Sequence, residues 1–241
     1  MAMNKTVNKL IEIFKNMKDE LENVGWYPVS AESTRWWGGA ETPDEVVITA
    51  ILVQQTRWDM VHEVLNRLRR LGLNTLEAIA NTDPNHLAET IKGVNYRFTK
   101  AQRLVKLARS IIMAGGLGKL RLRSDVRDFL LNQEGVGRET ADSIMLFALN
   151  IPTMPISQYT KRVLSRALGL NPGNDYDSWK RALENLIPRD LYIYKLVHAS
   201  VVTLGKMYCL PDNPLCDKCP LREICLYAKD RELPSIQQHR N

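Results

Sequence analysis

The stretch Glu134-Gly135-Val136-Gly137-Arg138 (EGVGR) separates two segments with helical patterning, DVRDFLLNQ at 125–133 and RETADSIMLFALN at 138–150. Two glycines in five residues allow a tight turn, because glycine adopts backbone conformations that other residues avoid. The N–H groups of such a turn can point outward together, and the next helix adds the positive end of its dipole. We therefore expect a helix-hairpin-helix, whose turn either binds a phosphate or simply connects two helices.

Helical patterning extends over the rest of the chain. Apolar residues recur every three or four positions from Val7 to Leu21, which predicts a helix of about 20 residues that stops near Gly25. Thr42-Pro43-Asp44-Glu45 has the form of a capping box and opens the apolar segment VVITAILVQQT. Further helical segments are predicted to end at Gly72 and Gly93 and to span roughly 97–114, 158–169, 176–187 and 189–207. No long stretch alternates with period two, so the sequence predicts an all-α protein.

Composition indicates a soluble globular protein. Of the 241 residues, 25% are charged and 44% hydrophobic, and the chain is long enough to bury a core. No apolar run approaches the roughly 18 residues that cross a bilayer, and no signal-peptide core follows the N-terminus, so we expect a cytoplasmic protein without a membrane partner. Lysine and arginine exceed aspartate and glutamate by 33 − 27 = 6, which permits a polyanionic partner such as nucleic acid.

All four cysteines fall in one short window with the spacing C-x6-C-x2-C-x5-C, at Cys209, Cys216, Cys219 and Cys225. A disulfide framework would distribute its cysteines over the fold. Four thiolates so close in sequence can instead hold one centre, either zinc or a [4Fe-4S] cluster. Structural zinc sites usually use two short C-x2-C knuckles, and this window has one, so the spacing favours the cluster with zinc as the alternative.

A helix-hairpin-helix followed by this cysteine pattern resembles the endonuclease III (HhH-GPD) superfamily of DNA glycosylases, and the resemblance runs from about Glu45 to Cys225. It implies a [4Fe-4S] cluster on the four cysteines. It also implies a helical barrel domain at 26–149, a second helical domain at 1–25 plus 150–241 that carries the cluster, and a DNA-binding cleft between them. The implied partner is double-stranded DNA with a damaged or mismatched base, which a monomer rotates out of the helix.

The resemblance also implies which residues contact DNA. The segment AILVQQT at 50–56 is similar to the family segment that inserts a glutamine into the gap left by the rotated nucleotide. Gln54 is therefore the expected wedge, although a buried polar pair that caps the preceding helix is the alternative. Residues expected to hold DNA phosphates or assist nearby are Gly135, Val136, Gly137, Arg138, Thr140 and Lys161.

Aromatic residues refine the expected substrate. Trp36, Trp37 and Trp58 match positions where bacterial 3-methyladenine glycosylases of the endonuclease III type place rings around the extruded base, and Tyr159 is a further pocket candidate. An N-alkylated purine is cationic, so indole rings attract it by stacking and by cation–π interaction. The alternative for Trp36 and Trp37 is core packing beneath the 26–42 loop.

The chain departs from the family at its reactive positions. The Schiff-base lysine of bifunctional members corresponds to Glu139, and a carboxylate forms no imine, so strand cleavage by that route is not expected. The family's aspartate, which stabilises positive charge on the sugar, corresponds to Ser157, whose neutral hydroxyl cannot do so. The glutamate of mismatch adenine glycosylases corresponds to Ala50. The loop 210–215 has no lysine or arginine, which weakens the expectation that it contacts phosphate.

Four functions remain open at this point. The leading hypothesis is a monofunctional glycosylase for alkylated purines, attenuated by a natural or engineered Ser157. The second is a DNA damage-binding protein that has lost the chemistry. In the third, the Glu139 carboxylate replaces the missing aspartate. In the fourth, the same fold removes uracil or thymine from mismatches.

Overall fold

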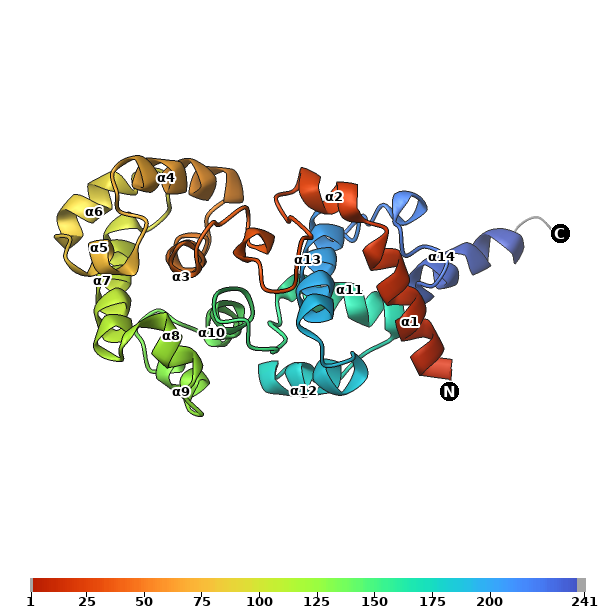
Figure 1. Ribbon diagram of the computed structural model, residues 1–241. Coiled ribbons are helices and arrows are strands. Elements are labelled where there is room, and N and C mark those ends of the chain that lie inside the picture. The colour runs from red at the N-terminus through yellow and green to blue at the C-terminus, as the bar shows by residue number, and fades with distance from the viewer. Residues whose placement is uncertain (1, 238–241) are drawn as a thin grey trace. The chain divides into compact units, whose positions relative to one another are not determined.

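The computed structural model describes residues 2–237, and every regular element in that range is helical (Figure 1). The all-α prediction is confirmed. Two compact units share the chain: unit 1 combines Met1–Ser30 with Met154–Asn241, and unit 2 is Ala31–Thr153. None of the helices within residues 2–237 combines the length and the apolar character that crossing a membrane requires.

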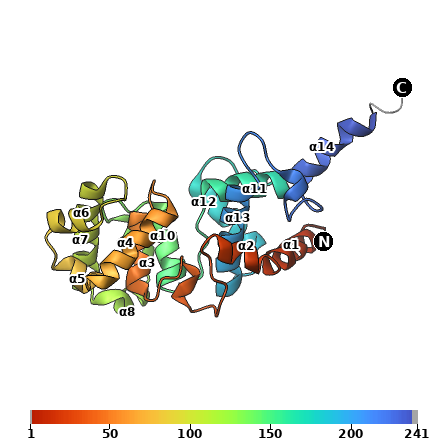
Figure 2. The same cartoon turned by 90° about the horizontal axis from the view of Figure 1, so that it is seen from above.

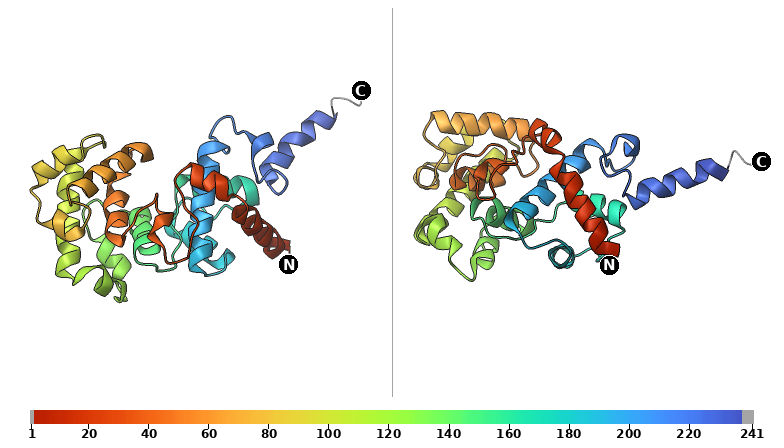
Figure 3. Two further views of the ribbon diagram at one scale, coloured as in Figure 1. Left: turned by 45° about the horizontal axis from the view of Figure 1, so that its top comes forward. Right: turned by 45° about the vertical axis from the view of Figure 1, so that its right-hand side comes forward.

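Unit 2 is a set of helices that surround two buried helical segments, at 45–52 and 144–148. Its elements are η1 (Thr34–Trp36), α3 (Pro43–Leu52), α4 (Trp58–Arg70), α5 (Leu76–Ala80), α6 (Pro84–Thr90), α7 (Arg97–Met113), α8 (Gly116–Arg121), α9 (Val126–Leu131), α10 (Arg138–Ser143) and η2 (Ile144–Ala148). Helix α7 packs against α5 and α6, which lie beside it in both views of Figure 3. Helix α3 packs against η2, and all of its residues from Glu45 to Leu52 are buried.

A buried ion pair fixes the start of α3. Thr42 caps the helix, because its Oγ1 accepts from the Glu45 amide at 3.2 Å. The fully buried Glu45 carboxylate does not complete the capping box; it accepts from the Glu41 amide at 2.7 Å and from Arg69 at 2.8 and 2.6 Å. Burial raises the pKa of Glu45, but hydrogen bonds from Arg69, the Glu41 amide and Asn74 outweigh it and lower the pKa. This pair ties α4 to the loop before α3.

Unit 1 is organised around its longest apolar helix. Its elements are α1 (Ala2–Lys15), α2 (Lys18–Asn23), α11 (Gln158–Leu168), α12 (Tyr176–Leu186), α13 (Leu191–Met207), η3 (Cys216–Lys218) and α14 (Leu226–Gln237). Helix α13 is buried from Tyr194 to Gly205 and contacts α1, α2 and α11. Figure 2 shows α11 and α13 side by side, and the cysteine loop follows α13 directly.

Several helices are shorter than the sequence predicts. The first one breaks between α1 and α2, where the Met17 amide bonds to the Phe14 carbonyl and the Met17 side chain turns into the core. The segment before Gly93 forms two helices, α5 and α6, because Thr75 and Asp83 each cap a new start. The segment 138–150 passes from α10 into the π-helical turn η2, and such turns are frequent at functional sites.

Candidate functional site

The turn between α9 and α10 is a glycine hairpin with two different glycine roles. Gly135 has φ +82°, and a Cβ atom there would lie 2.5 Å from Cδ of Arg103. Gly137 has an ordinary extended conformation, and a Cβ there would meet nothing within 4 Å. Val136 between them is buried. Backbone shape therefore requires glycine at 135, whereas glycine at 137 keeps the space in front of α10 open.

An ion pair holds the two helices of the hairpin together. Arg127 of α9 donates from Nε to Asp142 Oδ1 at 2.9 Å and from Nη2 to Oδ2 at 3.2 Å. The Asp142 side chain is fully buried and also accepts from Thr153 Oγ1 at 3.3 Å. Such a bidentate contact fixes geometry as well as adding energy. The Arg127–Asp142 pair therefore fixes how α9 and α10 pack against each other on either side of the turn.

Gln54 is bound to the hairpin. It follows the end of α3, and its Nε2 donates to the Gly135 carbonyl at 3.0 Å and to Thr140 Oγ1 at 3.2 Å. The structure thus brings together three of the residues that the sequence assigned to DNA contact. The predicted alternative, a polar cap on α3, does not describe these contacts, because both partners belong to the hairpin.

Sequence reasoning missed the residue that holds the Gln54 loop. Lys100 of α7 is buried, and its Nζ donates to the carbonyls of Leu52 and Gln54, each at 2.7 Å, and to Thr56 Oγ1 at 2.8 Å. Burial lowers the pKa of Lys100 to about 8. A lysine in a basic helix ordinarily faces water, so nothing local in the sequence marked it. The loop is fixed further by Asn95, whose amide nitrogens reach Gln55 and Thr56.

The structure separates the predicted aromatic residues. Trp36 is fully buried, so in this structure it is a core residue, as the alternative for it stated. Trp37 is also buried, as the same alternative stated; it donates from Nε1 to Thr49 Oγ1 at 3.0 Å, and its ring meets Trp58 in a T-shaped contact with centroids 5.9 Å apart. Trp58 is half-buried and lies on the backbone of Gly38, where a Cβ would approach its ring to 1.7 Å. Trp37 and Trp58 therefore form one aromatic cluster.

Glu139 lies in the first turn of α10, two residues after Gly137. The residue as a whole is exposed, but protein atoms around its carboxyl group desolvate that group and raise its pKa to about 7. Because this raised pKa lies near neutral pH, the Glu139 carboxyl group can gain or lose a proton under ordinary conditions.

The remaining predicted residues of unit 1 have contacts within that unit. Ser157 caps α11: its buried Oγ accepts from the Thr160 amide at 3.0 Å and lies 2.9 Å from Thr160 Oγ1. Tyr159 packs on Gly205 of α13, where a Cβ would come within 2.5 Å of its ring. Lys161 donates from Nζ to the Asn174 carbonyl at 2.9 Å. The Ser157 hydroxyl thus serves the backbone of its own helix.

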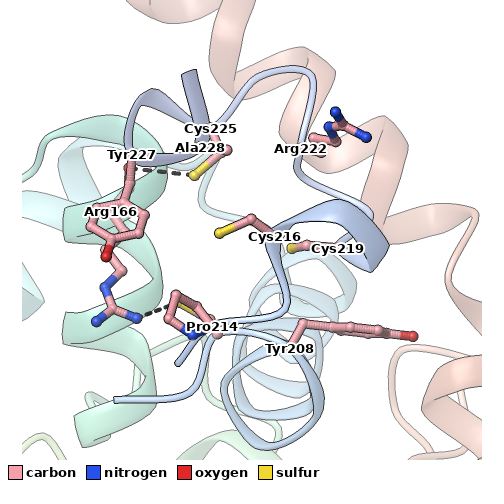
Figure 4. A pocket seen from close by; sticks show the side chains of 10 residues that line it. Arg166, Tyr208, Pro214, Cys216, Cys219, Arg222, Cys225, Tyr227 and Ala228 are labelled. Carbon is pink, nitrogen blue, oxygen red and sulfur yellow. Dashed lines mark hydrogen bonds between the residues drawn. The ribbon is translucent and has the colours of Figure 1, made fainter. Parts of the chain in front are cut away.

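The four cysteines line one cavity, together with Arg166 and Tyr227 (Figure 4). Arg166 Nη1 donates to Cys209 Sγ at 3.5 Å, and Cys225 Sγ donates to the Arg166 carbonyl at 3.6 Å. Burial raises the pKa of Cys219 to about 11 and also raises that of Cys225. All four are free thiols, and in the described part of the chain no three His, Cys, Asp or Glu side chains converge to hold a metal ion.

Two arginines connect the cysteine loop to the helix that Ser157 begins. Arg162 Nε donates to the Cys209 carbonyl at 2.7 Å, and Arg166 Nη1 donates to the Leu210 carbonyl at 2.6 Å. Both arginines belong to α11. The cysteine loop and α11 are therefore fixed to each other by contacts to backbone.

Comparison with known proteins agrees with this geometry. The chain is 37% identical over 224 residues to the "Putative DNA repair glycosylase MJ1434" of Methanocaldococcus jannaschii, covering 91% of this chain and 98% of that one. The structure of an endonuclease III trapped covalently on DNA has a TM-score of 0.70 at 21% identity and covers 93% of this chain and 98% of that one. The H. pylori 3-methyladenine DNA glycosylase bound to 1,N6-ethenoadenine has a TM-score of 0.66 at 25% identity, covering 82% and 96%.

A match to a protein family over more than half of the chain identifies the family of this protein. Residues 48–189 match the family described as HhH-GPD superfamily base excision DNA repair protein. This range contains Gln54, the hairpin and Ser157, and the resemblance seen in the sequence is confirmed. The chain belongs to the HhH-GPD superfamily of base excision DNA repair proteins.

Proposed function

We propose that this protein is a monofunctional DNA glycosylase that removes alkylated purines from double-stranded DNA. The Trp37–Trp58 cluster carries the proposal. Its half-buried ring, Trp58, lies against the Gly38 backbone and makes a T-shaped contact with Trp37. A fixed indole attracts a cationic purine more than a neutral base. The likeness to the H. pylori 3-methyladenine enzyme, which binds an ethenoadenine, supports the same substrate class.

The residues around the hairpin supply the DNA contacts in this proposal. A Cβ at Gly137 would meet no protein atom within 4 Å, and the amides there would hold a backbone phosphate without reading sequence. Gln54 would fill the gap left by the rotated nucleotide, after its amide leaves the Gly135 carbonyl and Thr140. Arg138, in the first turn of α10, would add electrostatic attraction.

The chemistry of excision explains why residues 139 and 157 matter. When the glycosidic bond breaks, positive charge grows on the deoxyribose, and a nearby carboxylate stabilises that charge. Ser157 has no charge, and its hydroxyl is committed to Thr160. Glu139 has no amine, so it forms no Schiff base with the sugar. We infer a hydrolytic glycosylase whose rate is limited by the neutral residue at position 157.

One observation favours a second candidate in which Glu139 provides the missing carboxylate. Protein atoms around its carboxyl group desolvate that group and raise its pKa to about 7. A group that titrates near the working pH can also exchange protons with water efficiently. In this candidate, the chain as it stands is an efficient enzyme.

We also propose that the four cysteines hold a [4Fe-4S] cluster. All four thiols line one cavity, and their spacing, with a single short C-x2-C knuckle between two longer loops, favours a cluster over one zinc ion. Bound iron would supply the positive charge that keeps these partly buried thiols deprotonated. The chain's own part is structural, because Arg162 and Arg166 connect the cysteine loop to α11.

The cluster assignment predicts a yellow-brown protein with broad absorbance near roughly 400 nm and about four irons per chain. Iron and acid-labile sulfide analysis after anaerobic purification checks it. A colourless protein with one zinc and no iron would contradict the assignment.

The aromatic cluster predicts that Trp58→Ala raises the activation free energy for excision of 3-methyladenine by about 1 to 3 kcal/mol, because base stacking is lost. The excision rate should fall roughly 5- to 150-fold. Trp58→Phe, the matched control, keeps a ring and most of the activity. Affinity for undamaged duplex should not change in either variant. Equal loss of binding to damaged and undamaged duplex would show instead that Trp58 only supports the fold.

The limiting role of residue 157 predicts that Ser157→Asp raises single-turnover excision by at least about 100-fold, because a carboxylate replaces a neutral hydroxyl. Aspartate also caps helices well, so α11 should be retained. Duplex affinity should stay constant, and Glu139→Gln should have little effect.

The same assay distinguishes the Glu139 candidate. If Glu139 supplies the carboxylate, it acts only when ionised, so the rate of the unaltered protein should rise as pH increases through about 7 and level off above it. Glu139→Gln would then abolish excision, and Ser157→Asp would change little. If neither the unaltered protein nor Ser157→Asp excises any alkylated base, the DNA damage-binding function replaces the enzymatic one.

A further inference from the structure

Two basic side chains of α7 lie directly beside the hairpin. Arg103 packs against Gly135, as the 2.5 Å approach of its Cδ to a Cβ at that position shows. Lys106, one turn later, donates from Nζ to Glu134 Oε2 at 2.7 Å. Arg103 Nε lies 3.6 Å from the other oxygen of the same carboxylate. Glu134 is the residue just before Gly135, so the hairpin turn carries an acidic group that contacts both cations.

The other basic side chains of α7 contact elements other than the hairpin. Arg97 pairs with Glu89 at 3.1 Å, Lys100 is buried under the Gln54 loop, and Arg109 Nε donates to the Ala80 carbonyl at 2.8 Å. Each of these contacts holds α7 to another part of unit 2. Arg103 and Lys106 therefore differ from them in contacting the hairpin, the element that we propose for phosphate binding.

The contact between Lys106 and Glu134 is accessible to water and easily exchanged. The Lys106 and Glu134 side chains are 65% and 54% exposed, and exposed ion pairs contribute little to stability. The hydrogen bond from Lys106 lowers the pKa of Glu134, so its carboxylate is ionised at neutral pH. An arginine and a lysine that together hold a two-oxygen anion can equally hold a phosphodiester.

We propose that Arg103 and Lys106 form a second phosphate-binding position, on α7 beside the hairpin, and that the Glu134 carboxylate competes with the DNA backbone for it. The inference rests on the proposed function, because its ligand is the phosphate of duplex DNA. Charge complementarity and direct continuity with the hairpin point to that ligand. Glu134 then lowers non-specific affinity, because a phosphate must displace the carboxylate and remain near its negative charge.

The test measures binding of an undamaged duplex by fluorescence anisotropy over a series of salt concentrations. Glu134→Gln should tighten binding about three- to tenfold at low salt, since an electrostatic competitor is removed. Lys106→Gln should weaken binding by a similar factor and make the slope of log affinity against log salt shallower by about 1. In the double variant, most of the gain from Glu134→Gln should be lost.

Matched controls come from α1, where Lys9→Gln and Glu12→Gln make the same charge changes on exposed positions of unit 1. The second phosphate position is overturned if the unaltered protein binds duplex, but the Glu134 and Lys106 variants behave like these controls. A failure of the unaltered protein to bind any duplex would overturn the proposed function itself. The two failures are therefore distinguishable in one titration series.

Discussion

The Gly135 backbone is the point on which the arrangement of unit 2 depends. Its positive φ turns the chain between α9 and α10, its carbonyl accepts the Gln54 amide at 3.0 Å, and Arg103 packs on its open face. Three segments distant in sequence thus meet at one residue without a side chain. Any larger residue would displace Arg103 and strain the turn. The proposed wedge and both proposed phosphate contacts are consequently positioned by one turn.

Local patterns predicted the elements, whereas contacts between distant residues decided the site. The hairpin, the Thr42 cap and the cysteine window could be read from short motifs, because glycine, capping residues and thiols have strong local preferences. The three bonds of Lys100 and the Glu45–Arg69 pair could not, since they join residues 24 to 48 positions apart. The burial of Trp36 and the half-buried position of Trp58 likewise depend on how η1 and α4 fold around Gly38.

In the proposed function, residues 139 and 157 alter the chemistry of excision and leave the framework of the fold in place. Serine is a good N-cap, and Thr160 completes a reciprocal capping box with it, so α11 keeps a well-defined start. Glutamate at 139 leaves the first turn of α10 intact. In the proposed function, DNA binding and base selection therefore persist independently of the rate of excision.

The most direct test of the hairpin as a phosphate clamp is the duplex affinity of Gly137→Val. The backbone at Gly137 has an extended conformation that valine adopts readily, and its Cβ meets no protein atom within 4 Å, so the midpoint of thermal unfolding should change little. The new side chain would, however, fill the space that a phosphate must occupy. We predict a loss of duplex affinity of at least about tenfold, equivalent to about 1.4 kcal/mol. Unchanged affinity in a fully folded Gly137→Val protein would contradict the account.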